Sequence, residues 1–373
     1  MKRSGSAVLP LHPGHAPGWL VGRMKSLAAE IVKVIIDEYG RDELLTRLSD
    51  TFWFQSLGCV LGYDWHSSGV TTVLTGVLRE AVNPTSTGVV VCGGKGKRSN
   101  RTPAEIRQYG TLFKFSEEQI ARLERSSRMV AKVDNAAIQA GYPLYHHAFM
   151  MTVEGKWAVV QQGLDTRDKT ARRYHWLSEH VHSFVDEPHD AIVGDTIRPT
   201  ALDMTSTESE QSRRLSVDLV NDGVEKLRDE MQSLRSDGQR LLTEWVWSQT
   251  HNRRYSNHQF LIMPRHIDWD AMKRAYEFQP TNYEELLGIQ GVGPGAVRAL
   301  ALVSQIIYGT EPSWRDPVKF SFALGGKDGV PFPVDRSAYD QTIQQLGHLI
   351  ENARLGEKEK YSALQRLKSI API

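Results

Sequence analysis

The stretch LLGIQGVGPGAVRALALVSQIIYG, Leu286–Gly309, contains a sharp interruption between two segments that favour a helix. The interruption is GVGP, Gly291–Pro294, and no helix interior readily accommodates these residues. Pro294 is typical of the first position of a helix, and a polar cap at Thr281–Leu287 begins the helix before it. We therefore expect two helices joined by a hairpin at Ile289–Gly293.

Two glycines in this hairpin predict a contact with phosphate. Gly291 and Gly293 permit backbone angles that other residues avoid, and without side chains they let a phosphate approach the amides. These amides lie at a helix N-terminus, where unpaired N–H groups and the helix dipole favour an anion. Val292 is expected to point into the core. Such contacts position a protein on DNA without reading bases, so we predict that Gly291, Val292 and Gly293 bind the DNA backbone; an ordinary helical hairpin is the alternative.

The composition of the chain is that of a soluble globular protein with room for two or three domains. Its 373 residues are 40% hydrophobic and 24% charged, and the net charge of +1 names no partner. Cys59 and Cys92 are too few for a disulfide framework, which suits a reducing cytoplasm. The N-terminus has no uninterrupted apolar core, and no segment approaches the ~18 apolar residues of a membrane span. We expect a cytoplasmic protein with no membrane partner.

Patterns along the chain predict a mixed α/β region followed by an all-α region. Helices are expected over residues 17–48 and 116–140, and strands over 88–92, 144–151 and 157–162. The polar segment 195–212 is the predicted boundary. We expect a mixed α/β catalytic domain over residues 1–200 and an all-α helix–hairpin–helix domain that binds DNA over residues 213–373.

The run DWHSSG at 64–69 provides the first candidates for chemistry. If the run is extended, Asp64 and His66 share a face, because alternate residues of a strand point to the same side. His146 and His147 lie in a histidine-rich stretch further along. We predict that Asp64, His66, His146 and His147 hold a divalent metal, Mg²⁺ or Mn²⁺. The alternative is a turn in which Asp64 caps a helix.

Acidic and basic groups in the N-terminal half of the chain favour cleavage of a phosphodiester. Such cleavage needs acidic groups that hold a metal and a basic group that steadies the developing charge. Lys132 and Asp134 lie two residues apart in a segment expected to be helical. The residues predicted to be catalytic in this reaction are Asp64, His66, Asp134 and His147.

The most basic part of the chain lies between residues 90 and 132. It holds ten Lys and Arg against four Glu, an excess of +6 in a chain whose net charge is +1. Within it, the loop GGKGKRSNR at 93–101 is expected to be flexible and to bind phosphates through Lys95, Lys97, Arg98 and Arg101. The loop does not match the phosphate-binding pattern G-x-x-x-x-G-K-[ST], so a nucleoside triphosphatase is not expected. A solvated charge run is the alternative.

A second pair of cations lies beside aromatic residues. Arg172 and Arg173 precede Tyr174, His175 and Trp176. Cations next to aromatic rings suit an unpaired nucleic-acid strand, so we predict that both arginines bind DNA. A packed helix edge would show the same pattern.

The C-terminal part of the chain, from about position 213 onward, resembles the helix–hairpin–helix DNA glycosylase superfamily. In that family a loop after the hairpin reaches an aspartate at the start of the next helix, and VPFPVDR at 330–336 looks similar, with Asp335 in the place of the aspartate. Bifunctional members carry a lysine where this chain has Gly295. The resemblance therefore implies a monofunctional glycosylase in which Asp335 is catalytic and no metal is required.

Nearly the whole chain also resembles an uncharacterised family of archaeal and bacterial proteins, known only as a domain of unknown function. The resemblance rests on LPLH at 9–12, DWHSSG at 64–69, KVDNAAIQAGYPLYHH at 132–147, WAVVQQG at 157–163 and ARRYHWLS at 171–178. It supports the domain layout and implies no activity.

Three functions remain open from the sequence, and each involves DNA as the partner. The preferred one is a metal-dependent nuclease of DNA repair, with its chemistry in the mixed α/β domain and the hairpin region gripping DNA. The alternatives are a glycosylase that uses Asp335 and a DNA-binding repair factor without catalysis. The polar groups that lie in apolar settings in the N-terminal half favour an enzyme.

Overall fold

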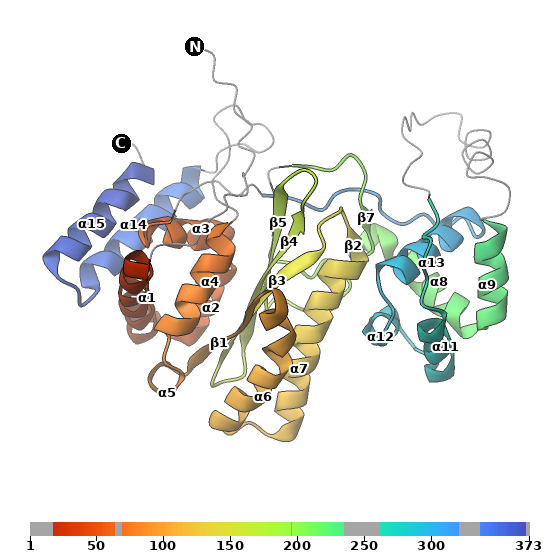
Figure 1. Cartoon of the computed structure of the whole chain (residues 1–373), viewed down its shortest axis with the longest axis horizontal. Coiled ribbons are helices and arrows are strands. Elements are labelled where there is room, and N and C mark those ends of the chain that lie inside the picture. The colour runs from red at the N-terminus through yellow and green to blue at the C-terminus, as the bar shows by residue number, and fades with distance from the viewer. Residues whose placement is uncertain (1–17, 64–68, 195, 235–261, 321–335, 371–373) are drawn as a thin grey trace, which may run out of the picture.

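A five-stranded antiparallel sheet lies between two groups of helices (Figure 1). The computed structural model describes residues 18–63, 69–194, 196–234, 262–320 and 336–370. The strand order is β1-β3-β4-β5-β6. The strands are β1 (Val89–Lys95), β3 (Leu144–Thr152), β4 (Trp157–Asp165), β5 (Thr170–Leu177) and β6 (Ala191–Val193). The mixed α/β architecture expected from the sequence is confirmed.

Both faces of the sheet are apolar, because helices cover both of them. Val89 and Val91 of β1 join one core, whereas Val90 and Cys92 join the other. Side chains alternate between the two faces along a strand, so each strand supplies both cores. A strand that is covered twice requires a continuous apolar run, and VVVC is such a run.

The first helical layer combines both ends of the described chain (Figure 1). Leu349 and Ile350 of α14 are buried in one core with Phe54 of α3. On α15, Nε of Arg366 donates to the carbonyl oxygen of Val60 at 2.8 Å. The helices of this layer are α1 (Gly18–Tyr39), α2 (Arg41–Ser49), α3 (Thr51–Val60), α4 (Gly69–Ala81), α14 (Arg336–Asn352) and α15 (Glu357–Ile370).

The second helical layer covers the opposite face of the sheet and extends to the right in Figure 1. Leu286 and Leu287 of α12 share its core with Met129 of α7. Its helices are α6 (Thr102–Leu112), α7 (Glu117–Lys132), the π-helical turn η2 (Val133–Ala137), α8 (Glu210–Asn221), α9 (Val224–Ser233), α11 (Trp269–Phe278), α12 (Tyr283–Gly288) and α13 (Pro294–Ile306).

The helices expected over residues 213–373 are divided between the two layers. After α13 the chain runs beside the short strand at residues 202–203, where Ser313 bridges Asp203, and then beside the edge strand β6, where Phe320 bridges Val193. Helices α14 and α15 then pack on the first layer. None of the helices in the described ranges is long and apolar enough to cross a membrane.

Two predicted elements differ from the structure for local reasons. The helix expected over 17–48 is broken at Gly40, whose φ of +91° lies in the left-handed region. The described part of the expected boundary segment, residues 196–212, contains the short strand β7 (Leu202–Asp203), which pairs with β2 (Ile138–Gln139). The division into two domains stays a prediction.

Candidate nucleic-acid interface

The hairpin between α12 and α13 needs glycine at one of its two glycine positions. Gly291 has a φ of +92°, and a Cβ there would lie 2.6 Å from Oδ2 of Asp268 and 2.7 Å from Cβ of Ala271. Gly293 has an ordinary extended backbone with a φ of −123°. A Cβ at Gly293 would meet only the carbonyl oxygen of Gly291, at 3.8 Å. The prediction of unusual backbone angles is therefore wrong for Gly293, although the space beside it is open.

The carbonyl groups of the hairpin are bound by side chains from the rest of the layer. Nζ of Lys132 donates to the carbonyl oxygens of Ile289 at 3.0 Å and Val292 at 2.5 Å. A guanidinium nitrogen of Arg274 donates to the carbonyl oxygen of Gln290 at 2.9 Å. Burial lowers the pKa of Lys132. Three carbonyls of the hairpin are thus occupied, and the N–H of Val292 is bonded to the Ile289 carbonyl at 3.2 Å.

The N–H groups at the start of α13 make no hydrogen bond to any described residue. Gly293 is the N-cap and provides no side-chain cap, and Pro294 has no N–H. The amides of Gly295 and Ala296 have no acceptor in the described ranges, and the first backbone bond of the helix runs from Val297 N–H to the Gly293 carbonyl at 3.0 Å. These free amides and the helix dipole together favour an anion at this end of α13.

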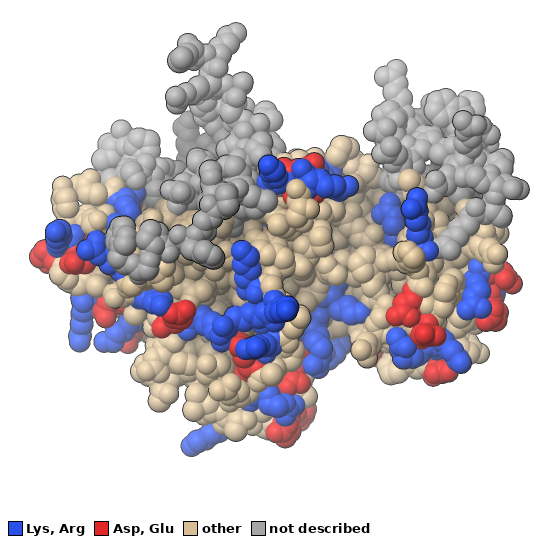
Figure 2. Space-filling view, in the orientation of Figure 1, with Lys and Arg blue, Asp and Glu red and all other residues tan. Residues whose placement is uncertain are grey.

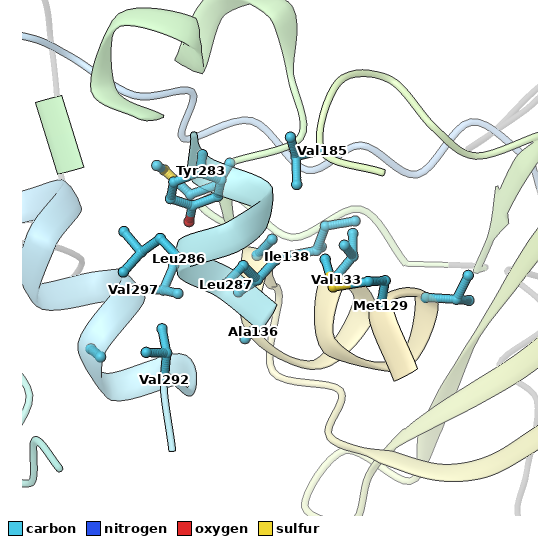
Figure 3. Close-up of a cluster of buried hydrophobic side chains, with 14 of the residues drawn as sticks. Met129, Val133, Ala136, Ile138, Val185, Tyr283, Leu286, Leu287, Val292 and Val297 are labelled. Atoms are coloured by element: carbon cyan, nitrogen blue, oxygen red, sulfur yellow. The ribbon is translucent and has the colours of Figure 1, made fainter. Parts of the chain in front are cut away.

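Val292 fixes the hairpin to the second layer, as expected from the sequence. Its side chain is buried and belongs to the apolar cluster shown in Figure 3, which also contains Val297 of α13. Leu287 of α12 and Met129 and Val133 at the end of α7 and the start of η2 belong to the same core. The position of the hairpin backbone is therefore set by apolar packing as well as by Lys132.

The predicted basic loop is an ordered segment. Gly93 to Lys95 continue β1, and residues 96–101 form a 3-10 helix, η1 (Gly96–Arg101). The expected flexibility is therefore wrong, because pairing of β1 with β3 extends through Lys95. The four predicted cations, Lys95, Lys97, Arg98 and Arg101, are all exposed. Of these, only Arg98 has a carboxylate within ion-pair range among the described residues, at 3.9 Å from Glu105.

The arginines of α6 and α7 are already paired with carboxylates, unlike most of the η1 cations. Arg107 contacts Glu117 at 2.7 Å and Glu124 at 2.9 Å, and Arg122 contacts Glu118 at 2.8 Å. In Figure 2, Lys and Arg side chains gather in the middle of the face shown, whereas both signs mix at the lower end of α6 and α7. Most of the positive charge of the segment 90–132 that has no close carboxylate partner therefore lies at residues 95–101.

Arg172 and Arg173 are fully buried, so the prediction that they bind DNA is wrong. The guanidinium of Arg172 forms two bonds to the carboxylate of Asp316, at 2.6 and 2.7 Å. Arg173 donates to Oε1 of Gln55 at 2.9 Å and lies over the ring of Phe54. Both side chains connect β5 to residues of other elements, Asp316 and Gln55. Neither side chain can reach a ligand at the surface.

His146 and His147 lie on opposite faces of the sheet, because adjacent residues of a strand alternate. Nε2 of His146 is 3.0 Å from Oγ1 of Thr75, and burial lowers the pKa of His146 to about 3. Burial also lowers the pKa of His147 to about 4. Both imidazoles are therefore neutral at neutral pH, and the structure does not bring their rings together.

Asp134 and His147 do belong to one buried polar network on the face of α7. Nδ1 of His147 is 2.6 Å from Oε1 of Gln161, and Nε2 of Gln161 donates to Oδ2 of Asp134. Nε2 of His189 lies 2.5 Å from the other oxygen of Asp134. Burial raises the pKa of Asp134, although its partners oppose this effect.

The network continues to a serine that the sequence did not single out. Oγ of Ser127 on α7 lies 2.9 Å from Nε2 of His147. Nε1 of Trp176 donates to Oδ2 of Asp134 at 3.0 Å. We call this set of six residues the Asp134 network: Ser127, Asp134, His147, Gln161, Trp176 and His189.

A cleft opens at the Ser127 end of the Asp134 network. Its volume is 410 Å³, and it lies between the second half of η1 with the start of α6 on one side and α7 with the start of β3 on the other. Ser127 and His147 line it, together with Arg128, Asn100 and Asn135. At the other end, His189 lines a second pocket of 320 Å³. The cleft beside η1 therefore contains the predicted catalytic residue His147 and is bordered by Ser99 and Asn100, from the segment predicted to bind phosphates.

Three predicted site residues, Asp64, His66 and Asp335, lie outside the described residues, and the structure does not place them. Within the described ranges, no group of three or more His, Cys, Asp or Glu side chains is arranged to hold a metal ion. His146 and His147 point to opposite faces of the sheet and so do not share one site; a Mg²⁺ or Mn²⁺ site that uses Asp64 and His66 stays a prediction.

Comparisons with known proteins identify a family but no activity. Searches of curated proteins and of solved structures found no match. A family model described as "Protein of unknown function (DUF763)" matches residues 5–334, which is most of the chain. The chain therefore belongs to the DUF763 family.

Proposed function

We propose that the protein binds DNA along its phosphate backbone, without preference for sequence. The observation that carries this proposal is the hairpin before α13, where the carbonyls of Ile289, Gln290 and Val292 are occupied while the amides of Gly295 and Ala296 have no acceptor among the described residues. A phosphate oxygen accepts such amide bonds, and they contain no base information.

The exposed cations of η1 support the same proposal. Phosphate contacts supply most of the sequence-independent affinity for DNA, and unpaired Lys and Arg gain more from a phosphate than cations that already have a carboxylate partner. Lys132, which binds the hairpin, and Arg128, which lines the cleft beside η1, are one turn apart on α7, roughly 6 Å along the axis. One segment of DNA backbone therefore has two neighbouring places to contact.

Gly293→Asp tests the hairpin without disturbing it. Aspartate is a favoured N-cap, and the extended backbone of Gly293 and the residue Pro294 after it both suit an N-cap. We expect the variant to unfold at the same or a higher temperature, because its carboxylate bonds the free amides of α13. DNA affinity should fall at least about tenfold, because that carboxylate occupies the amides and repels phosphate.

The measurement is fluorescence anisotropy with two labelled duplexes of unrelated sequence at fixed salt. Gly22→Asp, at an exposed position of α1 with open space around it, adds the same charge in the other layer and is the matched control. Affinity that stays at the wild-type value in a folded Gly293→Asp protein would reject the hairpin as a DNA contact.

The metal-dependent nuclease predicted from the sequence remains the catalytic part of the proposal. It rests on Asp64 and His66, which lie outside the described residues. Its test is cleavage of labelled DNA that is faster with Mg²⁺ or Mn²⁺ than in EDTA.

A further inference from the structure

We propose that Ser127 is a nucleophile whose proton is accepted by His147, and that the pair attacks a phosphodiester held in the cleft beside η1. The choice of a phosphodiester as the electrophile rests on the proposed function. The assignment of nucleophile and base rests on hydrogen-bond geometry alone.

The Asp134 network determines which atom of each partner carries hydrogen. The indole N–H of Trp176 can only donate, so Oδ2 of Asp134 is an acceptor. The Gln161 atom that faces Oδ2 also lies 3.3 Å from the carbonyl oxygen of Val130, which can only accept, so this atom is the amide nitrogen and Oε1 of Gln161 is turned toward His147. Oε1 can only accept, so Nδ1 of His147 carries the ring hydrogen.

This tautomer makes the hydroxyl of Ser127 the donor in its hydrogen bond to His147. With hydrogen on Nδ1, Nε2 of a neutral His147 presents a lone pair, and Oγ of Ser127 lies 2.9 Å from it. The hydroxyl hydrogen of Ser127 therefore points at His147. A hydroxyl that donates to an imidazole whose other nitrogen is held by an oriented acceptor is the arrangement that activates a serine.

The surroundings of the pair suit a phosphate. Arg128 and the side-chain amides of Asn100 and Asn135 line the same 410 Å³ cleft, and Arg128 has only a long contact to a carboxylate, 3.7 Å from Glu124. Ser99 and Asn100 line the cleft and belong to η1, the short helix that also carries the exposed cations Lys97, Arg98 and Arg101. The nucleophile Ser127, the base His147 and the orienting amide of Gln161 thus lie beside groups that attract negative charge.

The reaction step follows from these positions. Oγ of Ser127 forms a bond to phosphorus, and the bond from phosphorus to one ester oxygen breaks. The serine proton moves to Nε2 of His147 and from there to the departing oxygen, which leaves as a free hydroxyl. The remaining phosphoryl group is then an ester of Ser127, and attack by water, with its proton passing through His147, restores the serine.

A small activated phosphodiester tests the step apart from DNA binding. The probe is the p-nitrophenyl ester of thymidine 5′-phosphate, with EDTA present so that metal-dependent hydrolysis does not contribute. We expect a burst of about one p-nitrophenolate per chain and a thymidine phosphoryl group on the peptide that contains Ser127, seen by mass spectrometry. Ser127→Ala should lower the burst at least about 100-fold.

Two further variants keep the result interpretable. Ser216→Ala removes another buried helical serine, whose Oγ donates to the Ser212 carbonyl at 2.7 Å, and should leave the burst unchanged. Ser127→Cys keeps a nucleophilic atom, so the adduct should reappear at position 127 through sulfur, even if Ser127→Ala folds poorly.

The outcomes separate this inference from the proposed function. Wild-type protein that gives no adduct, or a burst that persists in folded Ser127→Ala, would overturn the nucleophile. An adduct on Ser127 in a protein that binds no DNA would support the nucleophile and reject the proposed function. DNA binding without an adduct would reject the nucleophile alone.

Discussion

The fold requires glycine at position 291, whereas it does not require glycine at position 293. Gly291 lies at a positive φ against Asp268 and Ala271, so its lack of a side chain is needed by the fold. Gly293 lies in open space at an ordinary φ, so the fold alone does not require glycine there. A position that is left without a side chain for no reason of folding, beside free amides, is consistent with a ligand that approaches the backbone.

Gly291→Ala should therefore destabilise the protein and Gly293→Ala should not. At Gly291 the left-handed backbone and the short contacts of a new Cβ are expected to cost about 1–3 kcal/mol of unfolding free energy. At Gly293 the change should stay within about 0.5 kcal/mol. Urea unfolding followed by circular dichroism measures both values. Equal losses in the two variants would contradict the backbone geometry described for the hairpin.

The contact between His147 and Gln161 is a part of the site that the sequence could have revealed. The predicted strands 144–151 and 157–162 leave residues 152–156 between them. If the facing ends of an antiparallel hairpin pair, 151 with 157, then 147 pairs with 161, which is the register observed. Ser127 could not be found in this way, because its contact depends on how α7 lies across the sheet.

Patterns in the sequence predicted correctly the elements that are determined by neighbouring residues. The strands β1, β3 and β4 are confirmed, because apolar runs and a tight turn determine them. The regular structure of the segment 93–101 was missed. Its first residues, through Lys95, pair with the neighbouring strand β3, which is far away in sequence. The burial of Arg172 and Arg173 was missed for the same kind of reason: their partners Asp316 and Gln55 are far away in sequence.

At the scale of the element, η1 should determine much of the salt dependence of DNA binding. Removing one cation that touches a phosphate lowers the slope of log affinity against log salt by about 0.9, because fewer counterions are released. Lys97→Gln with Arg101→Gln should therefore flatten the slope by up to about 2. Arg107→Gln with Arg122→Gln removes the same charge from cations that have carboxylate partners, and should change the slope little.

Anisotropy titrations at several salt concentrations measure both double variants of this experiment. An equal flattening in the two would show that DNA senses only the net charge of the protein. An unchanged slope after replacement of Lys97 and Arg101 would exclude η1 as a phosphate contact.

The C-terminal helices α14 and α15 complete the core of the first layer. The sequence predicted helices in this part of the chain, but it did not predict where they pack. The pattern of α14 shows an apolar face but does not say which surface covers it. In the fold, α14 and α15 leave the helices that precede them and complete the core under α1 and α3 (Figure 1). The layer that holds the hairpin is thereby separated by the sheet from the layer that holds the last helices.

Leu349→Ala should consequently weaken the fold while DNA affinity is retained. Leu349 of α14 is fully buried in the first layer, and removal of such a side chain costs about 2–5 kcal/mol of unfolding free energy. Glu351→Ala, two residues further on the exposed side of α14, is the matched control and should change stability by less than about 0.5 kcal/mol. Urea unfolding gives the free energies, and anisotropy under folding conditions gives the DNA affinity. A Leu349 variant as stable as the Glu351 variant would contradict the packing of α14 on the first layer, whereas a stable fold without DNA affinity would place a DNA contact on that layer.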